Sequence, residues 1–228
     1  MLLWIILTIP PLLLGLYAQR KVKRTFAQYS QVRPANGMSG AQAAQAVLQT
    51  AGLPGLSIEA IDGQLTDHYD PSSKTLRLSA DVGATSSIAA LGVAAHEAGH
   101  AVQDARGYMP MRIRQSIVPY ANIGASVWIW PTIGGIIFAA SSIGPALFAV
   151  GIGLFAVVVL FQLVTLPVEF DASRRALVAL EQQGLLQPSE MPGAKAVLNA
   201  AALTYVAGFI SALGQLLYFI LAFAGNRN

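Results

Sequence analysis

The sequence predicts an α-helical integral membrane protein with about four transmembrane helices and one small α/β domain. The 228 residues are 54% hydrophobic and only 11% charged, whereas soluble domains carry roughly 25% charged residues. Residues 1–19, 115–168 and 196–226 contain no charged residue and no histidine. The remaining 124 residues hold all 25 charged side chains, a density close to that of a soluble domain.

The three uncharged runs account for four membrane crossings. Residues 1–19 are long enough for one span, and they lack the basic start and small-residue cleavage site of a secretory signal, so a retained anchor is favoured over a signal peptide. A single helix over 115–168 would be about 80 Å long at 1.5 Å per residue. This run therefore predicts two helices joined by a turn at 141–145. Residues 196–226 form the fourth span.

The basic residues predict the orientation. A hairpin at 115–168 places residues 20–114 and 169–195 on one face, which then holds 13 of the 14 lysines and arginines and leaves only Arg227 opposite. Positive charge collects on the cytoplasmic side of membrane proteins. We therefore expect a multi-pass protein of the plasma membrane with Met1 and Asn228 outside. All eleven acidic residues and all three histidines share the cytoplasmic face.

The polar segment 20–114 reads as a small α/β domain. Ser39 and Gly52 bound a predicted helix, and residues 56–62 and 75–79 alternate apolar and polar side chains as strands do. The segment 67–71 is expected to be their connection, followed by a helix over 85–105. A domain of this size buries little apolar surface alone, so we expect it to pack on the membrane helices.

The motif H-E-A-G-H at residues 96–100 carries the chemistry. On a helix, His96 and His100 project from one face and can take two corners of a zinc tetrahedron, while Glu97 can act as general base. Chance matches to this short pattern occur. Here it lies in an otherwise uncharged stretch, where burying three ionisable groups without a metal would be costly. The chain has no cysteine, which excludes thiolate zinc sites, disulfides and thiol nucleophiles.

A catalytic zinc needs a third protein ligand, and the candidates are Glu169, His68, Asp171 and Asp104. Asp171 has Arg175 four residues later, a spacing typical of an ion pair on a helix. Glu169 follows a membrane span and would be held rigidly. His68 is expected in a loop and stays the alternative ligand.

Longer blocks resemble a known family. HEAGHAVQDA, YMPMRIRQSIVP, FQLVTLPVEFDASRRAL and VLNAAALTYVAG are similar to the YugP-type membrane zinc metallopeptidases over nearly the whole chain. The resemblance implies a zincin-like, gluzincin-type domain with one Zn²⁺ per chain, bound by His96, His100 and Glu169. More distantly the chain resembles HtpX-type peptidases, whose E-x-x-A-D pattern has Ser173 here in place of its aspartate. Asp171, Arg174 or Asp104 are candidates to take over the supporting role of that aspartate.

The expected reaction is hydrolysis of peptide bonds by metal-activated water, with Glu97 moving the proton. The expected substrates are proteins or peptides, and membrane proteins are candidates among them. Tyr205, His68 and Tyr69 are candidate donors to the oxyanion. For Tyr205, a membrane-interface tyrosine is the equally weighted alternative. The segment 75–79 is expected to bind substrate as an edge strand.

Two other functions compete with this interpretation. One is a site-2-type intramembrane protease, which the polar residues soon after the motif disfavour. The other is a non-catalytic, zinc-stabilised scaffold, which has no need of the general base Glu97. The net charge of +3 gives no indication of a nucleic-acid partner.

Overall fold

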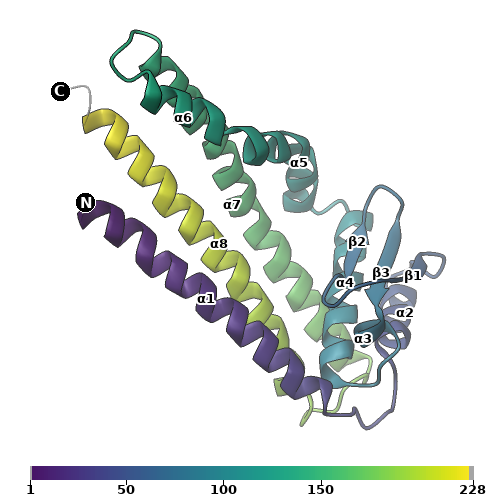
Figure 1. Cartoon of the computed structure of the whole chain (residues 1–228). Coiled ribbons are helices and arrows are strands. Elements are labelled where there is room, and N and C mark those ends of the chain that lie inside the picture. Colours follow the sequence, from purple (N-terminus) through teal and green to yellow (C-terminus); the bar gives the residue numbers. More distant parts are fainter. Residues whose placement is uncertain (1, 226–228) are drawn as a thin grey trace. The chain divides into compact units, whose positions relative to one another are not determined.

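The structure is a computed structural model that describes residues 2–225, and within them it is mostly helical with one three-stranded sheet (Figure 1). The chain divides into two compact units. The membrane unit comprises residues 2–17, 112–166 and 204–225, and the polar unit comprises 18–111 and 167–203. The expected placement of the termini depends on Met1, Arg227 and Asn228, which lie outside the described residues. Position 226, where the predicted fourth span ends, also lies outside them.

Three helices are long and apolar enough to cross a membrane: α1 (Leu2–Ser30), α7 (Gly144–Gln182) and α8 (Met191–Gly225). They confirm three of the four predicted spans. Each extends past an end of its uncharged run into charged residues, because a helix continues wherever the backbone geometry permits, whether or not the side chains are apolar. The 39-residue helix α7 continues past Val168, the end of the uncharged run, and carries Glu169 within it.

The expected second span is two helices, α5 (Met109–Val127) and α6 (Ile129–Ile137), separated at Trp128. Pro131 explains the break, since it has no N–H to donate to the carbonyl of Val127 four residues earlier. A fourth single spanning helix is therefore not among the described elements.

Within the membrane unit, α5 and α6 run antiparallel to α7 and form the predicted hairpin (Figure 1). A Cβ atom built on Gly135 would lie 2.7 Å from the backbone nitrogen of Phe148, and one built on Gly124 would lie 2.8 Å from the carbonyl oxygen of Leu154. Small residues thus let the two backbones approach closely. The turn occupies residues 138–143 and overlaps the expected turn at 141–145.

The polar unit contains helix α2 (Gly40–Thr50) and the sheet formed by β1 (Ser57–Ile61), β2 (His68–Asp70) and β3 (Thr75–Ser79). The short helix α3 (Ala80–Gly83) leads into the motif helix α4 (Ile88–Ala105). Ser39 caps α2 through a reciprocal pair of hydrogen bonds with Gln42, an arrangement that satisfies two backbone donors of the first turn.

The sheet corrects two predictions. Its order is β1-β3-β2, with β1 parallel and β2 antiparallel to β3. Residues 75–79 are therefore the central strand, with Thr75, Leu76 and Arg77 paired on both edges, and not the edge strand that was expected to bind substrate. His68 was expected in a loop but lies in β2. The tight turn after Asp70 returns the chain so that β3 pairs with β2, with Tyr69 opposite Leu76.

The core of the polar unit uses the long helices, as expected for a small domain. Buried side chains from the sheet and the motif helix, such as Leu76 and Leu91, belong to one cluster with Phe26 of α1, Leu180 of α7 and Leu198 of α8. These parts of α1, α7 and α8 all lie within the polar unit. The domain therefore obtains its core from segments far apart in the sequence.

Candidate metal centre

Helix α4 sets the positions of the two motif histidines. It begins after Ser87, whose hydroxyl accepts a hydrogen bond from the N–H of Ala90. His96 and His100 lie one turn apart on the same face, with ring centroids 4.7 Å apart and planes nearly perpendicular. Their side chains are only 12% and 9% exposed. The predicted helix and its histidine pair are therefore present.

Helix α7 brings Glu169 to this pair. Its Oε2 lies 3.2 Å from Nε2 of His96 and 3.6 Å from Nε2 of His100, and the Glu169 residue is 2% exposed. One ligand atom from each residue lies within 4.8 Å of the other two. Among the described residues, this trio is the group of histidines and carboxylates positioned to bind one metal ion.

The close approach of α4 and α7 depends on Gly99, the fourth residue of the motif. A Cβ atom on Gly99 would lie 2.8 Å from the carbonyl oxygen of Ala172 and 3.3 Å from its Cα. A side chain there would push the helices apart. The glycine of H-E-A-G-H thus has a packing role, which the sequence analysis did not identify.

Each histidine is oriented through the ring nitrogen that does not face Glu169. Ser173 Oγ lies 3.0 Å from Nδ1 of His96. Ser173 therefore contacts His96 from the position that corresponds to the aspartate of the E-x-x-A-D pattern, which the chain resembles only distantly. A partner on the second nitrogen fixes the tautomer and the ring orientation of a metal-binding histidine.

Gln103 provides the corresponding contact for His100. Its Oε1 lies 3.0 Å from Nδ1 of His100, and its Nε2 donates to the carbonyl oxygen of Val168 (2.8 Å) and to Oδ2 of Asp171 (2.9 Å). Gln103 is fully buried. Gln103 is not among the residues predicted from the sequence. The available signal is an amide three residues after a motif histidine, in a stretch expected to be buried.

Asp171 and Arg174 belong to this support. Asp171 is 6% exposed and pairs with Arg175, as its i+4 spacing indicated, and also with Arg174. Asp171 therefore reaches His100 only through Gln103. Two of the candidates for the supporting role are thus connected to the metal centre indirectly, Asp171 through Gln103 and Arg174 through Asp171.

Glu97 lies beside the trio with its carboxylate held by the main chain. The N–H of Tyr69 donates to Oε2 of Glu97 at 3.2 Å. Burial raises the pKa of Glu97 above its ordinary value, and the neighbouring histidines oppose that rise. The edge strand β2 is consequently the part of the sheet that faces the general-base candidate.

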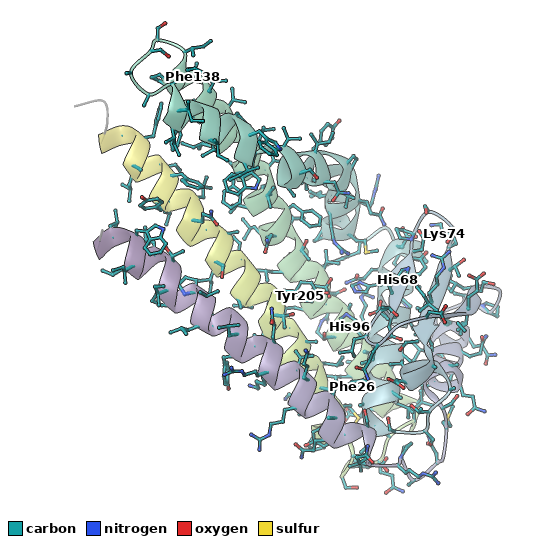
Figure 2. The ribbon with its side chains drawn as sticks, viewed as in Figure 1. Phe26, His68, Lys74, His96, Phe138 and Tyr205 are labelled. Carbon is teal, nitrogen blue, oxygen red and sulfur yellow. The ribbon has the colours of Figure 1, made fainter. Side chains whose placement is uncertain are left out.

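The other named candidates lie apart from the metal ligands. The hydroxyl of Tyr69 donates to Oδ2 of Asp104 (2.8 Å), which also pairs with Lys74 (2.6 Å). Burial and the contact with Asp104 raise the pKa of Tyr69. His68 is not one of the clustered ligands; its Nδ1 lies 2.8 Å from the carbonyl oxygen of Thr66, and Figure 2 shows it on the strand layer while His96 is on the helix.

Tyr205 belongs to α8 in the membrane unit, where it lines a cavity of about 230 Å³ together with Arg114, Asn122 and Gln162. It is 39% exposed. The described metal centre lies wholly in the polar unit and does not include it.

The donor set fits zinc. Two imidazole nitrogens and one carboxylate oxygen form the His₂Glu combination found in catalytic zinc sites, and three protein ligands leave a fourth position open. The buried carboxylate of Glu169 faces both Nε2 atoms, and the Nδ1 atoms are engaged by Ser173 and Gln103. Both histidines are therefore already turned with Nε2 toward the shared ligand position.

Comparisons with known proteins agree with this geometry. A family described as "Putative neutral zinc metallopeptidase" matches residues 4–224. The chain is also similar to "Putative membrane protease YugP" of Bacillus subtilis (strain 168), with 41% identity over 226 residues that cover 99% of each chain. No solved structure matches.

Proposed function

Because this chain belongs to the neutral zinc metallopeptidase family, we propose that it is a membrane-integral, gluzincin-type endopeptidase in which Glu97 is the general base. The observation that carries the proposal is the position of Glu97. Its carboxylate adjoins the trio His96, His100 and Glu169 and is held by the N–H of Tyr69. A purely structural zinc site has no use for such a carboxylate.

The residues divide the work between metal binding and proton transfer. Zinc, when bound, supplies a Lewis acid that lowers the pKa of water and polarises a carbonyl group. Glu97 takes the proton of the attacking water and delivers it to the leaving amine. Ser173 and Gln103 keep the histidines oriented throughout.

The substrate is an extended peptide that pairs with β2. This strand is at the edge of the sheet, and its Tyr69 N–H already points at Glu97. Main-chain pairing at a sheet edge accepts varied sequences. The scissile bond of a peptide bound there lies near the general base.

A donor to the oxyanion completes the proposal. We assign this role to Tyr205, with His68 as the alternative; both side chains can donate a hydrogen bond. The hydroxyl of Tyr69 is already committed to Asp104, which supports looking elsewhere. Replacing Tyr205 with Phe should lower kcat with zinc retained, and His68→Ala tests the alternative in parallel.

For topology, we propose four crossings, with α5 and α6 together forming the second. Residues 111 and 167 both belong to the polar unit, so the segment between them leaves that unit and returns to it. Thirteen basic residues on the predicted polar face support a cytoplasmic active site in the plasma membrane.

The decisive experiment compares wild type with Glu97→Gln for zinc content and for cleavage of denatured membrane proteins. We expect both proteins to hold one zinc per chain, and only the wild type to cleave. His96→Ala and His100→Ala should lose the metal. A Glu97→Gln protein that loses zinc and fold together would make Glu97 structural and overturn the proposal, whereas zinc-loaded wild type inactive on all substrates would favour a scaffold.

A further inference from the structure

A cavity of about 310 Å³ in the polar unit lies between α2, α4 and α7, and its chemistry is distinct from that of the metal centre. Three arginines line it: Arg106 at the end of α4, and Arg174 and Arg175 on α7. The other lining residues are small, apolar or uncharged polar, and none of the described lining residues is acidic.

The positive charge of this cavity is only partly neutralised. Asp171, which is buried, pairs with both Arg174 and Arg175. No ion pair of Arg106 occurs among the described residues. Arg174 remains 70% exposed despite its pairing, and the guanidinium of Arg175 stacks over the ring of Tyr108 at 5.7 Å. Arg174 and Arg175 thus share one carboxylate, so three arginines of the cavity stand against a single paired acidic group.

Two further observations indicate which anion fits. Guanidinium groups match phosphate oxygens in geometry as well as charge. Arg174 also follows Val168, the last residue of the uncharged run, by six residues in the same helix. At 1.5 Å per residue this is about 9 Å, so its long side chain can reach the headgroup layer, which is roughly 5–7 Å thick on each side of the bilayer.

We propose that this cavity binds the phosphate of an anionic phospholipid headgroup, and that the bound headgroup stabilises zinc in the metal centre. The second part rests on the proposed function. Arg106 comes from α4 and Arg174 from α7, and these helices also provide the histidines and Glu169. A phosphate that bridges the two arginines ties the two helices together.

A second route links the cavity with the metal ligands. Asp171 accepts from two arginines of the cavity, Arg174 and Arg175, and from Gln103, which in turn contacts His100. Ligands that bind the same folded arrangement stabilise each other reciprocally. Headgroup binding should therefore slow zinc release, and zinc should raise the affinity for the headgroup.

The test uses the full-length, zinc-loaded chain in a neutral detergent. Short-chain phosphatidylglycerol, short-chain phosphatidylcholine and inorganic phosphate are titrated separately, and zinc release to a chromophoric chelator is followed in each. We expect phosphatidylglycerol to bind and slow zinc release at least several-fold, phosphatidylcholine to do neither, and inorganic phosphate to bind more weakly. Arg106→Gln and Arg174→Gln should each weaken phosphatidylglycerol binding about tenfold, the loss expected for one charge-assisted contact, and abolish the effect on zinc.

Arg33→Gln is the matched control, because Arg33 is exposed in the polar unit, lies outside the cavity and carries the same charge. Equal weakening by Arg33→Gln would show diffuse attraction to the surface and overturn the site. Binding of inorganic phosphate without preference for the lipid would overturn the headgroup assignment. Binding without slower zinc release would overturn the coupling. None of these readouts requires proteolysis, so an inactive chain that still binds lipid refutes the proposed function alone.

Discussion

Gly99 lies against Ala172 so closely that a methyl group on the glycine would meet the carbonyl oxygen of Ala172 at 2.8 Å. Backbone atoms on both sides of this contact leave no flexible side chain to move aside. The spacing between α4 and α7, and with it the distance from Glu169 to the two histidines, is therefore set by the absence of a side chain in the motif.

The first prediction follows from this contact. Gly99→Ala should separate α4 from α7 and weaken zinc binding by at least tenfold, measured by competition with a chelator. Gly92→Ala in the same helix is the control, because its Cβ would meet Ala194 at an ordinary 3.6 Å. That variant should keep zinc and gain up to about 1 kcal/mol of stability from helix propensity. Equal zinc affinity in both variants would contradict the packing role of Gly99.

The second prediction concerns the third ligand. Glu169→Ala should strip or greatly weaken zinc, Glu169→Asp should hold it loosely, and His68→Ala should keep full stoichiometry. A carboxylate shortened by one methylene cannot meet the distance tolerance of about 0.2 Å. Zinc is counted by atomic absorption on purified protein. An empty site in His68→Ala with a full site in Glu169→Ala would reverse the assignment.

The third prediction tests the orientation of His100. Gln103→Leu keeps a side chain of similar size but removes the contacts to His100 and Asp171. Zinc affinity should fall by roughly 10- to 100-fold, as it does when other contacts behind a metal ligand are lost. Gln28→Leu, at an exposed position on α1 in the polar unit, is the control and should bind zinc as the wild type does.

The fourth prediction concerns topology. The reporter cysteine is placed in the turn between α6 and α7, at the exposed Ser142. The nearby Gly144 is unsuitable, because it is buried against Phe138 and cannot accept a side chain. Because the chain has no cysteine of its own, an impermeant maleimide should label Ser142→Cys in intact cells and leave Gln64→Cys unlabelled until the cells are opened. The reverse pattern would overturn the proposed orientation.

The fifth prediction is a pH dependence of stability. Hydrogen bonds from Ser72, Ser73 and Arg77 hold the pKa of Asp70 far below its usual range. A carboxylate with a depressed folded-state pKa stabilises the fold above its unfolded value, about 3.9, and this contribution is lost as the pH falls toward the folded value. Asp70→Asn should therefore be less stable than wild type above about pH 4.

That difference should shrink as the pH falls below about 4, as followed by denaturant unfolding at a series of pH values. Asp62→Asn removes an exposed carboxylate from the same region and serves as the control. An Asp70→Asn difference that stays constant down to the lowest pH would show that the hydrogen bonds do not favour the ionised form.

Much of the architecture follows from patterns that the sequence displays directly. Uncharged runs longer than 18 residues predict helices that can span a membrane, and the alternation in 56–62 and 75–79 predicts two strands. Strand β2 could not be predicted, because three residues are too few for alternation to appear. Its pairing also depends on the turn after Asp70, which only the folded hairpin reveals.

The same distinction applies to the candidate site. His96, Glu97 and His100 are predictable because one helix presents them at a fixed spacing. Glu169 was inferred from its position after a span and from the family resemblance. Gln103 and Ser173 were not identified as supports, since each acts across the contact of α4 with α7. A contact between residues more than 60 positions apart in the chain leaves no periodic signal.

The hydrogen bond from Tyr69 to Glu97 has a consequence for how such a protein can diversify. Its donor belongs to the peptide backbone, so every residue type except proline can supply it. Side chains along β2 can therefore change without loss of the contact that holds the general base. In the proposed function, peptide preference depends on the side chains of β2 and proton transfer on its backbone, so selection could alter the first without damaging the second.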